Sequence, residues 1–252
     1  MVKYRTGRKI AGRLLLFLKA AAASFFILSL LTGCMYPEKE MAKNQVPYKD
    51  QIQSVQSAVN QFKQDNGGIL PIKTRDASTP YYQRYPVDFG RLKPYIAEPP
   101  GNSFDNGGVF QYVIINEEKD PTVKLFDVRM ADKVQDISIR LDMYLQSHKY
   151  PPVKEVLNYN AYILDYKKLG YKKAPTVLSP YTQKELQVVM GNDGKLYVDY
   201  TPDLQEALNK RKESFKPGED IRGILAKESM FVPAFSLPYT IEKGTRKIIF
   251  MK

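Results

Sequence analysis

The chain contains one ordered set of sequence patterns twice, and this duplication limits what it can fold into. Each copy has an amphipathic helical pattern, an X-Pro step, a Val/Leu-Asp-aromatic-x-x-Leu motif, a proline-rich loop and two strand patterns joined by a turn. The motif that begins at Val87 returns at Leu164, 77 positions further along. One helix with one hairpin buries its apolar face poorly. We therefore expect two similar units that pack on each other.

The two copies predict matching elements. In the first copy, apolar residues at three- and four-residue steps predict a helix through Ile52 and Phe62, which Gly67 and Gly68 end. Residues 109–115 and 123–129 predict a hairpin. In the second copy we expect the helix over residues 132–147 and the hairpin strands over 185–190 and 196–199.

A shorter unit follows the second copy. Thr201 is expected to cap a helix that runs to residue 214, with Pro202 in its first turn. Residues 221–230 predict a further helical turn, and residues 239–242 and 246–251 predict a last hairpin around Lys243 and Gly244. This order suggests a partial third copy.

The N-terminal segment has a different character from the rest of the chain. An apolar run of about a dozen residues, 20–31, is too short for an ordinary membrane span but suits a secretion signal. Six basic residues and no acidic one precede it, a bias that holds an N-terminus on the cytoplasmic side: Lys3, Arg5, Arg8, Lys9, Arg13 and Lys19. The run ends in Leu31-Thr32-Gly33-Cys34, and Cys34 is the only cysteine of the chain.

This ending closely resembles the lipobox of bacterial lipoproteins. The resemblance implies that a signal peptidase recognises Leu31, Thr32 and Gly33 and cleaves after Gly33. It also implies that the Cys34 sulfur carries diacylglycerol, with or without an added N-acyl chain such as palmitate. The chain as a whole resembles uncharacterised lipoproteins of Gram-positive, spore-forming bacteria. The alternative is an uncleaved signal anchor that spans the membrane with residues 14–18 and 20–31.

These observations predict an α+β protein with two tandem helix-plus-β-hairpin modules and a short C-terminal unit, after an N-terminal lipoprotein signal peptide. The expected divisions are a signal peptide over 1–33, a tether over 34–47, a first module over 48–130, a second module over 131–200 and a C-terminal helix and hairpin over 201–252.

Composition excludes several classes of protein. With one cysteine, the chain forms no intramolecular disulfide and no thiolate metal cage. Beyond the leader, 32 basic residues face 27 acidic ones, a small excess for a nucleic-acid binder. The sequence has no Gly-x-Ser-x-Gly, His-Glu-x-x-His or phosphate-binding glycine motif. We expect no metal and no cofactor other than the acyl groups on Cys34.

A few residues remain as candidates for a site. Asp88 and Asp165 occupy matching positions and suggest either an acid/base pair or, as we favour, two helix caps. His148, the only histidine, is expected at the exposed end of a helix. Four lysines interleaved with aromatic residues form either a solvated face or a contact with an anionic surface: Lys167, Lys168, Lys172 and Lys173.

The function expected from the sequence is that of a lipid-anchored protein on the outer face of the cell membrane. Without a catalytic motif, a binding or scaffolding role is favoured over catalysis. The expected partners are membrane lipid through Cys34 and an anionic wall polymer or another envelope protein, and not nucleic acid. The first alternative is a hydrolase of cell-wall glycan or lipid that uses carboxylates, which leave no local signature. The second is a solute-binding lipoprotein, although the strand–helix alternation of such proteins is missing.

Overall fold

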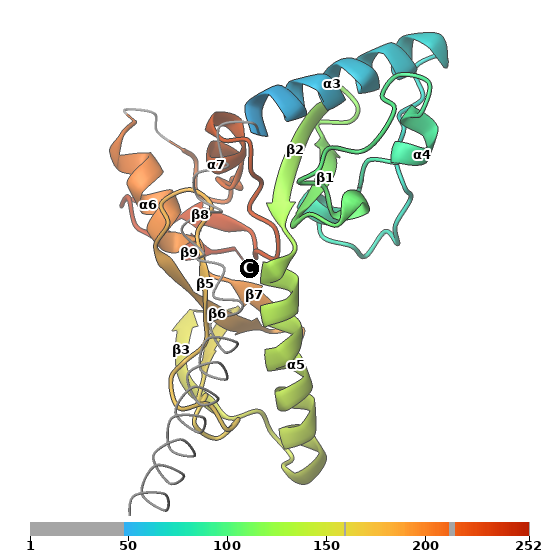
Figure 1. Ribbon diagram of the computed structural model, residues 1–252. Coiled ribbons are helices and arrows are strands. Elements are labelled where there is room, and N and C mark those ends of the chain that lie inside the picture. Colours follow the sequence, from blue (N-terminus) through green and yellow to red (C-terminus); the bar gives the residue numbers. More distant parts are fainter. Residues whose placement is uncertain (1–47, 159, 212–214, 252) are drawn as a thin grey trace, which may run out of the picture. The chain divides into compact units, whose positions relative to one another are not determined.

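The computed structural model describes residues 48–158, 160–211 and 215–251. They form a mixed α+β structure with three small antiparallel sheets (Figure 1). The predicted fold class is therefore confirmed. The leader, the tether and the motif from Leu31 to Cys34 lie outside the described residues. Within the described part of the chain, no helix combines the length and the apolar character needed to cross a bilayer.

The first module is a helix packed on a hairpin, as the sequence predicts. Helix α3 (Tyr48–Asp65) places Val55, Val59 and Phe62 against strands β1 (Phe110–Ile115) and β2 (Thr122–Asp127). The helix ends where Gly67 and Gly68 take positive φ angles of 62° and 89°. A side chain at either glycine would strain this left-handed turn.

Strand β1 is buried on both faces, which explains its almost continuous apolar sequence. Tyr112 and Ile114 face α3, whereas Val113 and Ile115 join a separate cluster with residues of the C-terminal unit. The connection before β1 contains the short helices η1 (Tyr81–Gln83), α4 (Phe89–Leu92) and η2 (Phe104–Asn106).

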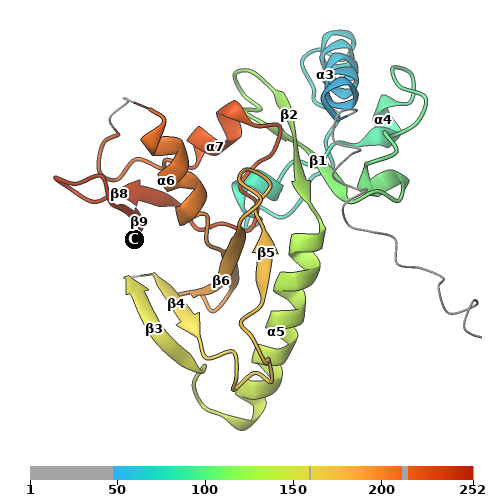
Figure 2. The same cartoon turned by 60° about the vertical axis from the view of Figure 1, so that its left-hand side comes forward.

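The second module is larger than the predicted helix and hairpin. Helix α5 (Arg129–Ser147) packs Ile137 and Leu141 into the core of a five-stranded sheet. The predicted hairpin forms from β6 (Glu185–Gly191) and β7 (Leu196–Val198), but the sheet also contains β3 (Val153–Asn158), β4 (Ala161–Leu164) and β5 (Thr176–Leu178) (Figure 2). These added strands are short, and bulges interrupt the pairing of β3 with β4, so they lack a clear sequence period.

The two copies of the repeated motif make the same local contacts. The Asp88 N–H donates to the carbonyl of Pro71 (2.7 Å), and the Asp165 N–H donates to that of Pro152 (2.6 Å). An antiparallel bridge joins Ile72 to Val87 in the first module, and β3 and β4 pair Val153 with Leu164 in the second. In each module, the segment at the X-Pro step therefore pairs with the start of the aspartate motif.

The C-terminal unit contains α6 (Thr201–Asn209), α7 (Gly223–Glu228), β8 (Tyr239–Ile241) and β9 (Ile248–Phe250). Helix α6 ends five residues before the predicted position, and the prediction that Thr201 caps it is wrong. Tyr200 occupies the cap position, and Asp199 Oδ1 accepts from the Thr201 N–H (2.9 Å). The Ile221 N–H donates a hydrogen bond to the Tyr239 carbonyl. In the first module, the Val87 N–H donates to the Tyr112 carbonyl in the same way. This shared contact supports the partial third copy.

The C-terminal unit packs against both modules. It shares one core with α5 and the five-stranded sheet, and a second, smaller cluster with β1 and β2. The Leu125 N–H donates to the Met230 carbonyl, and the Val232 N–H donates to the Leu125 carbonyl, both at 2.9 Å. Residues 230–232 thus lie along the outer edge of β2.

Candidate functional site

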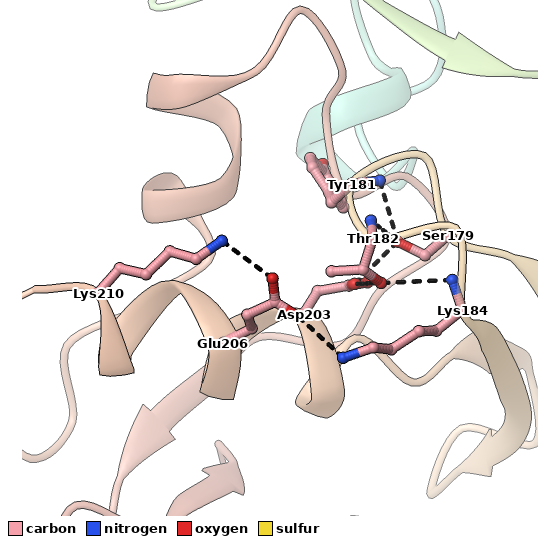
Figure 3. Close-up of polar contacts among 7 residues, drawn as sticks. All are labelled: Ser179, Tyr181, Thr182, Lys184, Asp203, Glu206 and Lys210. Atoms are coloured by element: carbon pink, nitrogen blue, oxygen red, sulfur yellow. Dashed lines mark hydrogen bonds and ion pairs between the residues drawn. The ribbon is translucent and has the colours of Figure 1, made fainter.

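A group of buried and charged polar side chains lies where the loop between β5 and β6 meets the first turn of α6 (Figure 3). We call it the carboxylate cluster and define it by seven residues: Ser179, Tyr181, Thr182, Lys184, Asp203, Glu206 and Lys210. It borders a hollow of about 240 Å³ beside α7. Within the described residues, no group of three or more His, Cys, Asp or Glu side chains is placed to hold a metal ion.

Asp203 is the buried member of the carboxylate cluster, with only 1% of the residue exposed. Its Oδ1 accepts hydrogen bonds from the hydroxyls of Ser179 (2.8 Å) and Thr182 (2.6 Å). Its Oδ2 has no hydrogen-bond partner among the described residues. Burial raises the pKa of the Asp203 carboxyl, and the two hydroxyls offset part of that rise.

The loop between β5 and β6 is folded so that both hydroxyls reach Asp203. Ser179 Oγ accepts from the backbone N–H groups of Tyr181 (3.0 Å) and Thr182 (3.1 Å), which closes a tight turn. Gln183 completes the turn with a φ of 58°, a backbone conformation rare outside glycine. The turn therefore holds Thr182 over the start of α6.

Glu206 lies one helical turn beyond Asp203, and the pKa of its carboxyl is shifted in the opposite direction. Lys184 (2.8 Å) and Lys210 (2.9 Å) both contact its carboxylate, and Figure 3 shows them approaching from two sides. Hydrogen bonds to these lysines lower the pKa of Glu206 to about 2. Neighbouring carboxylates with pKa values shifted in opposite directions occur in acid/base sites. Here the bonds of both carboxylates also tie the loop to α6.

The aspartates predicted from the repeated motif accept hydrogen bonds from nearby backbone N–H groups. The Asp88 carboxylate accepts from the Gly90 N–H (3.0 Å) at the start of α4. The Asp165 carboxylate accepts from the Lys167 N–H (3.2 Å) in the matching turn. Each therefore bonds the backbone of its own module: the helix-cap interpretation is confirmed for Asp88, whereas Asp165 begins a turn that is not a helix.

His148 also lies where the sequence predicts, exposed at the end of α5. Its ring stacks on that of Tyr144 with the centroids 3.8 Å apart. Its Nδ1 lies 2.9 Å from the Tyr144 carbonyl oxygen. These contacts are local to the helix end.

The four predicted lysines are exposed on one turn beside α5: Lys167, Lys168, Lys172 and Lys173. Aromatic side chains fix this turn from within. Tyr166 donates to the Val188 carbonyl (2.6 Å), and Tyr171 donates to Asp136 (2.6 Å) under the guanidinium of Arg140. In the described part of the chain, no carboxylate forms an ion pair with any of the four.

Sequence reasoning missed the carboxylate cluster because its parts are far apart in the chain. Ser179 and Asp203 are separated by 24 residues, and neither belongs to a recognisable motif. The only available signal was the Thr201-Pro202 helix start, which places Asp203 in a first turn where acidic residues are favoured.

Comparison with known protein families finds a match in the first module. Residues 48–127 match the family model of the YphF family N-terminal domain. These residues run from the first residue of α3 to the last residue of β2. No curated protein and no solved structure matches the chain.

Replacing Asp203 by asparagine is expected to remove one source of pH dependence from the stability of the chain. Because the Asp203 pKa is raised above its ordinary value of 3.8, the folded chain keeps this proton to higher pH than the unfolded chain. The wild-type free energy of unfolding therefore falls as pH rises from about 4 through the raised pKa. Asp203→Asn does not titrate, so its stability relative to wild type should increase across that window.

Urea unfolding of both chains from about pH 4 to pH 7 checks this expectation. Glu206 has the opposite effect on the pH dependence of stability. Because its pKa is lowered, its charged carboxylate stabilises the fold fully above pH 4.5, and this stabilisation is lost as pH falls toward 2. That contribution is common to both chains and cancels in their difference. As a control, Asp203→Ala should cost about 1–3 kcal/mol, since two hydroxyls lose their acceptor. A difference between wild type and Asp203→Asn that stays constant with pH would contradict the argument.

Proposed function

We propose that this protein is a lipoprotein of the outer face of the cell membrane that acts by binding or scaffolding. One observation carries the proposal: Leu31-Thr32-Gly33-Cys34 ends the apolar run and contains the only cysteine of the chain. Cys34 is the acylated residue, and Leu31, Thr32 and Gly33 are read by the signal peptidase. Two acyl chains on one thioether hold a protein to a bilayer firmly, whereas one holds it marginally.

The chemistry of the described residues supports a non-catalytic role. Asp88 and Asp165 are engaged with backbone N–H groups. Asp203 accepts from two hydroxyls, and Glu206 is neutralised by two lysines. These bonds hold loops to helices, which is what a rigid binding surface requires. The small antiparallel sheets also differ from the doubly wound lobes of a solute-binding protein.

Replacing Cys34 by serine is expected to abolish lipid labelling of the protein, because the hydroxyl does not accept the diacylglycerol group. The measurement is incorporation of an alkyne-tagged fatty acid in living cells, followed by mass spectrometry of the mature N-terminus. Thr32→Ser is the matched control and should keep full labelling, since position 32 needs only a small side chain. Persistent labelling of Cys34→Ser would refute the anchor, as would a soluble native chain that begins before residue 34.

The binding role is tested by crosslinking in living cells, with the crosslinker placed in the tyrosine-rich part of the lipidated protein that follows the tether. We expect capture of an anionic wall polymer or of another envelope protein. The proposal is overturned if the purified protein turns over a wall substrate and loses that turnover on replacement of Asp88 or Asp165.

A carboxylate-using hydrolase of wall glycan or lipid remains the second candidate. The observation in its favour is the hollow lined by both Asp203 and Glu206, whose pKa values are shifted in opposite directions. Incubation of the protein with purified wall glycan and with phospholipid tests it. Release of product by wild type but not by Asp203→Asn would establish this candidate in place of the first, and no release by wild type would remove it.

A further inference from the structure

One end of the second module exposes an unusual number of large apolar side chains. Ile139 and Met143 are one helical turn apart on α5, and 63% of Met143 is exposed. Leu145, Tyr150 and Val153 follow on the last turn of α5 and the approach to β3, with Tyr150 69% exposed. The views in Figures 1 and 2 agree that the end of α5 and the start of β3 lie at the same end of this module.

Two shallow grooves flank the end of α5, and one of them reaches the turn that carries Lys167 and Lys168. Ile139 and Met143 line one groove together with Lys168. Leu145, Tyr150 and Val153 line the other. The apolar residues therefore lie on both sides of α5 at this end of the module, and the lysines lie beside them. We call this surface the module tip and define it by the five apolar residues and six lysines: Ile139, Met143, Leu145, Tyr150, Val153, Lys149, Lys154, Lys167, Lys168, Lys172 and Lys173.

The module tip carries an excess of positive charge. Residues 139–175 contain seven lysines and arginines but three aspartates and glutamates. All six lysines of the tip are exposed, and none forms an ion pair with a described residue. A surface that combines apolar side chains with unpaired lysines is complementary to an anionic lipid bilayer, which offers acyl chains beneath a layer of phosphates.

We propose that the module tip docks on the anionic leaflet to which Cys34 anchors the chain. Met143, Ile139 and Tyr150 enter the boundary between headgroups and acyl chains, and the lysines contact lipid phosphates. This inference rests on the proposed function, because the anchor supplies the bilayer. The tether over 34–47 reaches at most about 45 Å, which keeps the body close to the lipid surface. An anionic wall polymer would attract the lysines but would leave the apolar side chains exposed to water.

The absence of tryptophan from the chain allows a direct test. A single tryptophan is introduced by Met143→Trp in the lipidated protein, which is reconstituted into vesicles of phosphatidylcholine with phosphatidylglycerol. Docking should shift its emission to shorter wavelength and expose it to quenching by brominated acyl chains. Vesicles of phosphatidylcholine alone should give neither effect. The matched reporter is Phe104→Trp on η2 of the first module, where Phe104 is 58% exposed, and its emission should not change.

The electrostatic part of the proposal is tested by a quadruple substitution. Changing Lys167, Lys168, Lys172 and Lys173 to glutamine should remove the emission shift of Met143→Trp. It should also weaken the docking equilibrium at least about tenfold, since each lysine near an anionic surface strengthens binding severalfold. The control carries the same charge change at exposed lysines elsewhere and should keep the shift: Lys49, Lys93, Lys119 and Lys227 to glutamine.

Flotation of the same vesicles separates this proposal from the one on which it rests. If the protein floats with the vesicles but the Met143→Trp emission is unchanged, docking is wrong and the anchor stands. If the protein does not float, the anchor itself is wrong. Equal shifts at positions 143 and 104, or lysine-dependent binding to purified wall polymer with no shift on vesicles, would also overturn docking.

Discussion

Replacing Tyr239 by alanine is expected to lower the free energy of unfolding by about 3–5 kcal/mol, the usual cost of deleting a buried aromatic side chain. Tyr239 is 0% exposed and packs on Phe250, with the ring centroids 4.7 Å apart. Its hydroxyl accepts from the Tyr200 N–H (2.8 Å) and donates to Asp199 (3.1 Å). One side chain thus connects the C-terminal hairpin to the junction of β7 and α6.

The conservative variant Tyr239→Phe separates the hydroxyl from the ring. It should cost about 1–3 kcal/mol, because the buried Tyr200 N–H is left without its acceptor. Urea unfolding followed by circular dichroism measures both changes. The control is Tyr150→Ala at an exposed position, where we expect a change within about 0.5 kcal/mol. If Tyr239→Ala were no more destabilising than this control, the assigned role of the hairpin in stability would be wrong.

The elements that the sequence predicts correctly are those whose signal is local. The apolar period through Val55, Val59 and Phe62 defines α3 by itself, and the glycines that follow end it. The aspartate contacts at Asp88 and Asp165 are also local, since each bonds a backbone N–H two residues further on. Both contacts form within one short motif, which is why the duplication could be read as repeated structure.

The features that the sequence does not reveal depend on pairing between distant residues. The five-stranded sheet requires β4 and β5 to pair with different parts of β6, β4 with residues 190–191 and β5 with residues 185–187, and no local pattern specifies that pairing. The bridge from Phe231 to Leu125 spans more than a hundred residues. The carboxylate cluster likewise depends on the contact between Ser179 and Asp203. In each case the tertiary structure brings together segments that are individually unremarkable in sequence.

A buried charge at Val232 is expected to uncouple the C-terminal unit from the first module. Val232 is 1% exposed and lies in the cluster that includes Val113 and Phe126. Arg222, which lies over the ring of Tyr82 in the same cluster, already contacts Asp220 and Ser236. A carboxylate introduced by Val232→Asp would be buried among apolar side chains, and we expect a loss of about 4 kcal/mol or more.

Amide hydrogen exchange shows which part of the structure is destabilised. In Val232→Asp the amides of Leu125 and residue 232, which bond across the junction, should lose protection well before those of α6, whose core is shared with the second module. The matched control is Leu178→Asp, which places the same charge on a side chain that is 55% exposed, and protection at the junction should be unchanged. Uniform loss of protection throughout Val232→Asp would mean that the two modules and the C-terminal unit unfold as one cooperative body. Retained protection at Leu125 would mean instead that residues 230–232 do not hold the edge of β2.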